Sequence, residues 1–211
     1  MGESTDVLRL SSRASAEFGR ARIEPSDPVI AGSYGTWRLV YTVGARGIAS
    51  GGAIKIDTDS DSDWGWPQLE DPSAPDYLTL TAPEGAEVAL HLRDHLSFVL
   101  LVAGRPLSPG EQIALTLGDR SGGGPGSRAQ TFREERRRFW VEVDTDGGGS
   151  FTPLLDPPEL TIIGGAVARL VVVVPSTAIV GEPFSLRVKA EDAWGNPRLG
   201  QGQRQRVVAR A

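Results

Sequence analysis

Residues 36–43 read T-W-R-L-V-Y-T-V, and large apolar side chains recur at every second position. Successive side chains of a β-strand point to opposite faces, so this period of two predicts a strand with one face in a core. Trp37, Leu39, Tyr41 and Val43 form the expected buried face. Residues 53–57 alternate in the same way after a glycine-rich connection at 44–52, and the two runs together predict a β-hairpin.

The rest of the chain carries more short apolar or alternating runs, separated by glycine and proline turns. None has the 3, 4, 7 spacing of apolar residues that would predict a long helix. The pattern predicts an all-β fold, namely an immunoglobulin-like β-sandwich followed by a partial or truncated second β module. We expect a loose arm at residues 1–17, the sandwich at 18–155 and the partial module at 156–211, with two prolines at the division.

The composition narrows the class of protein. The formal net charge of −5 argues against a nucleic-acid partner, because domains that bind phosphate backbones normally present a basic face. The chain has no cysteine, which excludes disulfides and thiolate chemistry. Its longest aliphatic run, residues 170–174, is far shorter than the roughly 20 residues that cross a bilayer, and no signal peptide is evident. We therefore expect a soluble protein without a membrane partner, cytoplasmic if the chain is complete and of open location if it is a fragment.

Residues 175–197 read P-S-T-A-I-V-G-E-P-F-S-L-R-V-K-A-E-D-A-W-G-N-P and resemble the front half of bacterial immunoglobulin-like modules. In those modules a Val-Gly-x-Pro turn begins a strand and an Asp-x-x-Gly-Asn-Pro turn ends it. The Gln- and Arg-rich residues 198–211 depart from that pattern. The resemblance therefore implies a module of which the later strands are missing.

Three longer segments carry a second resemblance: G-S-Y-G-T-W-R-L-V-Y-T-V-G at 32–44, D-W-G-W-P-Q at 63–68 and G-D-R-S-G-G-G-P-G-S-R-A-Q-T-F at 118–132. They look like the N-terminal β region of an uncharacterised bacterial family. In that family the region precedes a barrel that resembles the polymerase-and-histidinol-phosphatase type of metallophosphoesterase. The His-rich motifs of that barrel have no counterpart here, so the resemblance implies an accessory β region and does not carry the barrel's enzymatic activity across to this chain.

Acidic residues suggest two places for a metal ion, with Ca²⁺ as the candidate cofactor. Ca²⁺ takes six to eight oxygen ligands at ~2.3–2.6 Å, whereas alternate residues of a straight strand lie roughly 6.6 Å apart, so the first segment would have to curl. A solvated loop is the alternative there, and catalytic carboxylates are a third. In the second segment, D-T-D-G-G-G-S, the alternative is a plain hairpin turn. The candidate ligands are Asp57, Asp59, Asp61 and Asp63 in the first segment, and Asp144 and Asp146 in the second.

The turn D-W-G-W-P gives a candidate ligand site of another kind. Trp64 and Trp66, with the adjacent Asp63, could stack against a carbohydrate-type ligand, and the alternative is that the two rings pack inside the protein. Trp37 and Trp140 sit in alternating strands, where we expect them to belong to the core.

No residue is assigned a catalytic role. His91 and His95 have the i, i+4 spacing of a helical zinc site, but the segment is predicted as strand, turn and strand, which favours surface histidines. Three hypotheses follow. The first is a non-catalytic accessory or interaction domain of a larger multidomain bacterial protein, with a neighbouring domain or protein as its partner. The second is a carbohydrate-type binding module assisted by Ca²⁺, and the third is the N-terminal portion of a metal-dependent hydrolase.

Overall fold

A computed structural model describes residues 17–58, 62–94 and 96–197, and within these ranges the chain is all-β. It divides into two compact units at Ile163 and Gly164. The predicted arm at 1–17 lies, apart from Glu17, outside the described residues. Among the residues described, no helix has the length and apolarity needed to span a bilayer.

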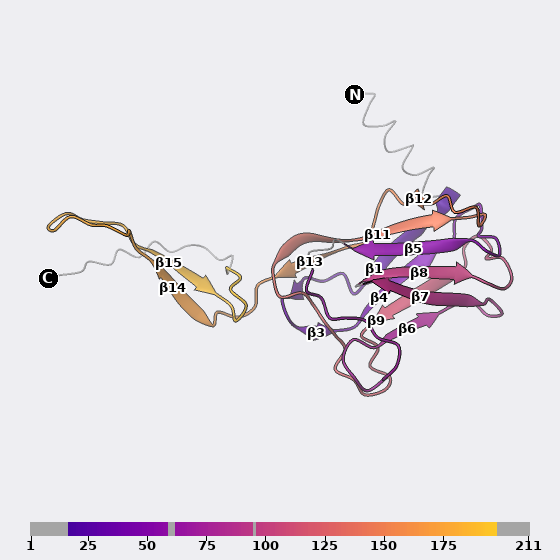
Figure 1. The fold of residues 1–211 in the computed structure, drawn as a ribbon, viewed down its shortest axis with the longest axis horizontal. Helices are drawn as coiled ribbons and strands as arrows, with labels where there is room; N and C mark the ends of the chain where they lie inside the picture. Colours follow the sequence, from indigo (N-terminus) through magenta and orange to yellow (C-terminus); the bar gives the residue numbers. More distant parts are fainter. Residues whose placement is uncertain (1–16, 59–61, 95, 198–211) are drawn as a thin grey trace, which may run out of the picture. The chain divides into compact units, whose positions relative to one another are not determined.

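A four-stranded antiparallel sheet forms one layer of the first unit (Figure 1). Its order is β1 (Arg20–Glu24), β4 (Trp37–Thr42), β9 (Gln112–Leu117) and β6 (Leu78–Thr81). The strand predicted at 36–43 is confirmed as β4. Trp37 lies opposite Leu117 in the register, and Leu39 lies opposite Leu115, so the apolar face of each strand continues across the sheet.

A seven-stranded sheet forms the other layer. Its path is β2 (Val29–Ile30), β13 (Glu159–Ile163), β11 (Glu134–Asp144), β5 (Ala53–Thr58), β8 (Ser97–Val102) and β7 (Val88–Asp94), and β12 (Thr152–Pro153) pairs with β11. The pairing of β13 with β2 is parallel, and the other pairings are antiparallel. The two sheets enclose one hydrophobic core, which makes the first unit a β-sandwich. An immunoglobulin-like topology stays a prediction.

The predicted hairpin between residues 36–43 and 53–57 is wrong. The first run becomes β4, which pairs with β1 and β9, and the second becomes β5, which pairs with β11 and β8 in the other sheet. The connection between them crosses the end of the sandwich, where Ile48 forms a bridge with Leu107. Alternation shows that each strand has one buried face, but it does not show which neighbour supplies the hydrogen bonds.

The first unit continues past the predicted division at residues 155 and 156. β13 pairs along β11, with Leu160 opposite Arg137, and both Leu160 and Ile162 are buried in the core of the sandwich. The prolines turn the chain back onto β11 instead of ending the unit, since Phe139 N donates to Pro158 O at 2.8 Å. The boundary therefore falls after Ile163.

In the second unit, β14 (Arg169–Val173) and β15 (Arg187–Glu191) form an antiparallel two-stranded ribbon. The turn 192–197 closes against the start of the unit through Asp192. One oxygen of this carboxylate accepts hydrogen bonds from Trp194 N at 2.9 Å and Asn196 N at 2.8 Å, and the other accepts from Gly165 N at 2.9 Å. The D-A-W-G-N-P turn is thus fixed by its first residue.

The Asp192 carboxyl should make the second unit sensitive to acid. Burial raises its pKa, but hydrogen bonds from Asn196, Gly165 and Trp194 outweigh burial and lower the pKa from 3.8 to about 2. A carboxyl group whose pKa is lower in the folded state stabilises the fold at pH values above its unfolded-state pKa. That contribution is lost as the pH falls to the folded-state pKa. We therefore expect the turn to loosen between about pH 4 and pH 2, as measured by ¹³C NMR of the carboxyl group. A titration midpoint near 4 would contradict this expectation, and Asp192→Asn should remove the transition.

Candidate functional site

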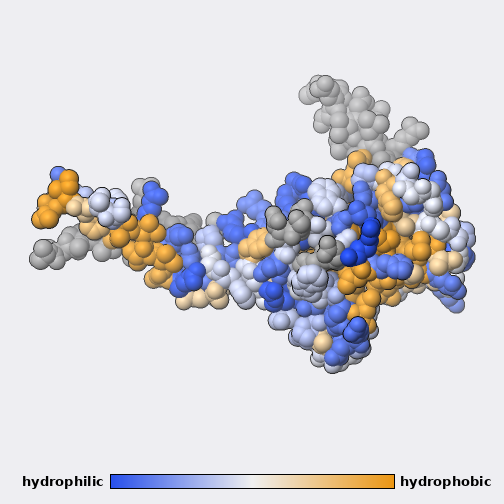
Figure 2. All heavy atoms as spheres, in the orientation of Figure 1, coloured by the Kyte–Doolittle hydropathy of each residue, from blue (hydrophilic) through white to orange (hydrophobic). Residues whose placement is uncertain are grey.

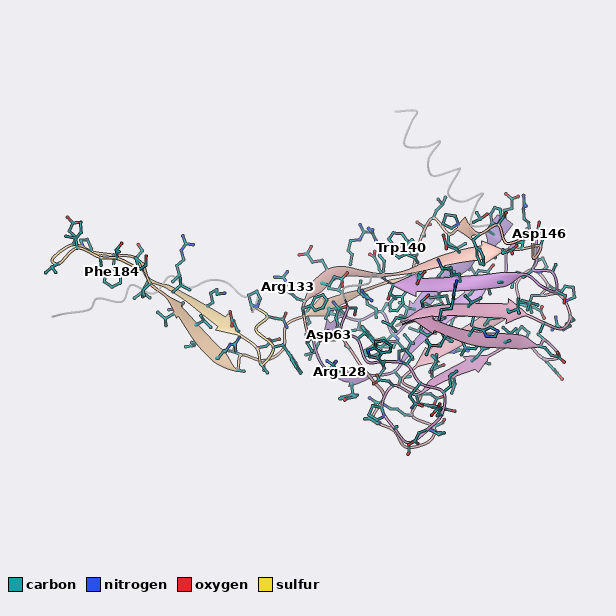
Figure 3. The ribbon with its side chains drawn as sticks, viewed as in Figure 1. Asp63, Arg128, Arg133, Trp140, Asp146 and Phe184 are labelled. Atoms are coloured by element: carbon teal, nitrogen blue, oxygen red, sulfur yellow. The ribbon has the colours of Figure 1, made fainter. Side chains whose placement is uncertain are left out.

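The three segments 32–44, 63–68 and 118–132 meet at one end of the sandwich. β3 (Tyr34–Gly35) pairs with β10 (Ser127–Arg128), and Gly65 N donates to Arg128 O at 2.8 Å. Figure 3 shows Asp63 and Arg128 together at this end. We call this surface the loop end, and it contains all the described residues of the D-W-G-W-P turn.

Trp64 lies at the centre of the loop end and is fully buried. Its indole Nε1 donates to Ser127 Oγ at 2.9 Å, and its ring meets Trp37 edge-to-face, with 4.7 Å between the ring centroids. A second edge-to-face contact, at 6.4 Å, joins Trp64 to Phe139 of the opposite sheet. A stacking platform needs an exposed ring face, so the prediction of Trp64 as a ligand-binding residue is wrong. The ring belongs to the core.

A hydrogen-bond network holds the loops around Trp64. Asp76 Oδ1 accepts from Ser127 Oγ at 2.7 Å and from Arg128 N at 2.9 Å. Gly65 lies so close that a Cβ atom there would overlap the Asp76 carboxylate, which explains the glycine between the two tryptophans. Asp76 and Ser127 were not among the residues predicted from the sequence. An aspartate after a proline signals a turn, but nothing in the sequence indicates a partner so far along the chain.

Asp63 also links the turn 63–67 to the segment 127–131 by hydrogen bonds. Its two carboxylate oxygens accept from Thr131 N at 2.7 Å and from Thr131 Oγ1 at 2.6 Å, while Arg128 donates to Asp63 O at 2.8 Å. Burial raises the pKa of Asp63, but the Thr131 hydrogen bonds and the Arg128 charge outweigh burial, so the net pKa lies below its ordinary value. Both oxygens are thus engaged with the 127–131 segment.

The outer surface of the loop end exposes aromatic rings, among them those of Trp66 and Tyr34. Trp66 is 68% exposed and Tyr34 is 47% exposed. They lie on neighbouring segments, because Arg128 is opposite Tyr34 in the register and its carbonyl accepts from the amide of Gly65, next to Trp66. Arg120 donates to Tyr34 O at 3.2 Å from the adjoining loop. Of the two tryptophans predicted to bind a ligand, the structure leaves Trp66 accessible.

The carboxylates predicted to bind Ca²⁺ in the first segment are only partly described. Asp57 pairs with Lys55 Nζ at 2.8 Å, and Asp59 and Asp61 lie outside the described residues. No cluster of three or more His, Asp or Glu side chains that could hold a metal ion occurs in the described part of the chain. A calcium site in this segment stays a prediction.

The second predicted segment closes on its own backbone. Asp144 accepts from Gly147 N at 3.0 Å and from Gly149 N at 2.8 Å, and Asp146 accepts from Gly148 N at 2.9 Å. These are the contacts of a tight turn stabilised by side chains. Figure 3 shows Asp146 at the end of the sandwich opposite Asp63, so the fold does not bring the two acidic segments together.

His91 lies exposed on β7, so its segment is a strand as predicted and not a helix. His95 is outside the described residues. The glycine-rich loop 118–126 packs against the segment 72–76, since a Cβ at Gly122 would overlap Pro72 and one at Gly124 would lie 2.7 Å from Ala74 O. Asp76 N also donates to Gly126 O at 2.9 Å. The glycines thus allow close approach of two backbones.

The chain matches no family model. It is similar to three chlamydial proteins, each described only as an uncharacterized protein. The identity is 25% over 187 residues for the protein of Chlamydia pneumoniae, 28% over 183 residues for that of Chlamydia trachomatis and 28% over 184 residues for that of Chlamydia muridarum. In each case the match covers 79% of this chain and 28% of the relative. The chain thus spans less than a third of the length of the curated relatives that it matches.

Proposed function

We propose that the chain is a non-catalytic accessory or interaction β region of a larger bacterial protein, and that another β segment of that protein covers its second unit. The observation that carries the proposal is the distribution of side chains on the β14–β15 ribbon.

One face of this ribbon is entirely apolar. Leu170 lies opposite Ala190 in the register and Val172 lies opposite Val188, so the four side chains share one face. We call it the apolar ribbon face. Leu170 is 67% exposed, Val172 58% and Val188 51%. Figure 2 shows apolar residues gathered over this unit.

The opposite face of the ribbon is charged. Arg169 lies opposite Glu191, and Lys189 lies opposite Val171. Glu191 Oε2 is 2.9 Å from Arg169 Nη2, and its Oε1 is 3.0 Å from Lys189 Nζ. A sheet with one apolar and one charged face is the pattern of a layer that covers a core on one side and meets water on the other.

A two-stranded ribbon is marginal by itself and becomes stable when its apolar face is packed. A further β layer is therefore the occupant that fits. The resemblance of residues 175–197 to the front half of an immunoglobulin-like module supports this proposal. The greater length of the chlamydial relatives supports it too, because proteins of that size have room for the missing layer.

Amide hydrogen exchange tests the proposal on the 211-residue chain and on the complete natural polypeptide that contains it. The amides of β14 and β15 should exchange about 100-fold more slowly in the complete polypeptide, since a packed face prevents local opening. Leu170→Thr, Val172→Thr and Val188→Thr together should abolish the difference while keeping strand propensity. The matched control, Val171→Thr with Val173→Thr on the charged face, should preserve it. Equal exchange in both proteins would overturn the proposal.

A second candidate function is carbohydrate binding at Trp66. Of the two tryptophans proposed to stack on a saccharide, this one is 68% exposed and therefore accessible to a ligand. If a saccharide stacks on Trp66, Trp66→Ala should abolish the change in tryptophan fluorescence that the saccharide causes, since stacking on an aromatic face would be lost. Tyr34→Phe retains the neighbouring ring and serves as the control. Unchanged saccharide binding in Trp66→Ala would rule out this surface.

A further inference from the structure

A groove of about 500 Å³ lies on the outer side of the first unit, where β11, β13 and the 155–157 turn meet. Its volume falls in the range of small-molecule sites, which is roughly 300–1,000 Å³. The side chains that matter here are Arg136, Arg138, Trp140, Leu155, Asp156 and Glu159.

The period of β11 places the groove residues outside the core. Arg137, Phe139 and Val141 point inward and are each 1% exposed or less. Trp140 therefore points outward and is 38% exposed, so its prediction as a core residue is wrong. Leu155, which is 54% exposed, adds a second apolar side chain to the lining.

Charged side chains position one another around the tryptophan. Glu159 lies opposite Arg138 in the register and accepts from Arg136 Nε at 2.9 Å. Arg138 Nε is 3.8 Å from Glu159 Oε2, and the guanidinium carbon of Arg138 lies 5.3 Å from the centre of the Trp140 ring. This cation–π contact and the ion pairs limit the motion of the side chains. These contacts place Arg138 and Glu159 beside the Trp140 ring.

The balance of charge indicates the class of ligand. Arg136 and Arg138 are offset by Asp156 and Glu159, so the lining has no net formal charge. An anion would compete with Glu159 for both guanidinium groups. A neutral sugar suits the groove better, because its hydroxyl groups donate to carboxylates and accept from guanidinium groups. Its C–H face can also pack on an exposed indole and a leucine.

We infer that this groove binds a neutral oligosaccharide, with the sugar ring against Trp140 and its hydroxyl groups between Arg138 and Glu159. The inference rests on neither the ribbon nor the loop end. It assigns saccharide binding to a tryptophan other than Trp66.

Isothermal titration of the 211-residue chain with neutral hexasaccharides tests the inference, using β-glucan, α-glucan, mannan, xylan and chitin fragments at millimolar concentration. At least one should bind, and Trp140→Ala should weaken that binding at least about 10-fold, in line with the loss of an aromatic contact and its apolar area. Trp194→Ala is the matched control, since it removes a 54% exposed tryptophan that lies in the second unit, outside both the groove and the loop end, and it should leave the affinity unchanged. No binding across these five sugars would overturn the inference.

Two further measurements separate binding in the groove from binding elsewhere on the chain. Arg138→Met removes the guanidinium group but keeps the aliphatic stem, and it should weaken binding at least about 5-fold at an unchanged melting temperature, as expected when a hydrogen bond to a charged group is lost. Binding should persist at a high NaCl concentration of about 0.5 M, because a neutral ligand gains little from long-range electrostatic attraction. A loss of binding in salt, or a loss in Trp66→Ala with Trp140→Ala unaffected, would overturn the assignment.

Discussion

Trp64→Ala is expected to destabilise the first unit by about 3–5 kcal/mol, the usual cost of truncating a buried tryptophan to alanine. The substitution removes the edge-to-face contacts with Trp37 and Phe139, which join the two sheets through one ring. It also removes the hydrogen bond to Ser127 Oγ. For a unit of this size the melting temperature should fall by roughly 10 °C, because each kcal/mol corresponds to about 2–4 °C.

Urea denaturation followed by circular dichroism measures this loss. Trp64→Phe keeps an aromatic ring but cannot donate to Ser127, so its destabilisation should be smaller than that of Trp64→Ala. Trp66→Ala, on the next large residue of the same turn, should change the free energy of unfolding by no more than about 0.5 kcal/mol, as exposed substitutions usually do. If the two alanine variants lost equal stability, Trp64 would not have a central packing role.

Gly118→Ala is expected to destabilise the first unit by about 3 kcal/mol or more, since it combines backbone strain with overpacking. Gly118 has a φ of 70°, which side chains other than glycine rarely adopt. An added Cβ would also meet backbone atoms, overlapping Ser127 N and lying 2.6 Å from Gly35 O. Those atoms belong to β3 and β10, so they cannot move without breaking the pairing of these strands.

Gly123→Ala is the matched control for this prediction. Gly123 lies in the same loop and has a φ of 87°, yet an added Cβ would meet nothing within 4 Å. Its cost should be only the strain of the left-handed conformation, about 1 kcal/mol. Thermal or urea unfolding of the two variants therefore separates strain from crowding. Equal costs at the two positions would contradict the close packing of the loop end.

The period of two predicted most strands correctly, because burial of one face imposes it locally. The same alternation also indicates that Trp140 is exposed. Phe139 and Val141 mark the inward face of the strand, and Trp140 lies between them and so points outward. Large aromatic residues are often buried in strands, but at Trp140 the alternation decides and the ring lies on the outward face. In a strand with one buried face, the alternation of its neighbours predicts the burial of a residue better than the size of its side chain does.

The burial of Trp64 could not be predicted in this way. Residues 63–67 form a turn without periodicity, and the partners that enclose the ring come from β4, β10 and β11. The false hairpin has the same origin, because local alternation holds no information on which strand lies alongside. The three segments that carry the second resemblance, 32–44, 63–68 and 118–132, do meet in the structure, and their contacts hold loops in place. The groove at Trp140 lies outside all three segments.

The position of β13 has a mechanical consequence. It is the last strand before the second unit, and it lies inside its sheet, with β11 on one side and β2 on the other. Ala31 N adds a hydrogen bond to Ile163 O at the point where the chain leaves the first unit. A force that pulls on the second unit would therefore act on the hydrogen bonds of β13 to both β11 and β2. It would not peel off a strand that is paired on one side only.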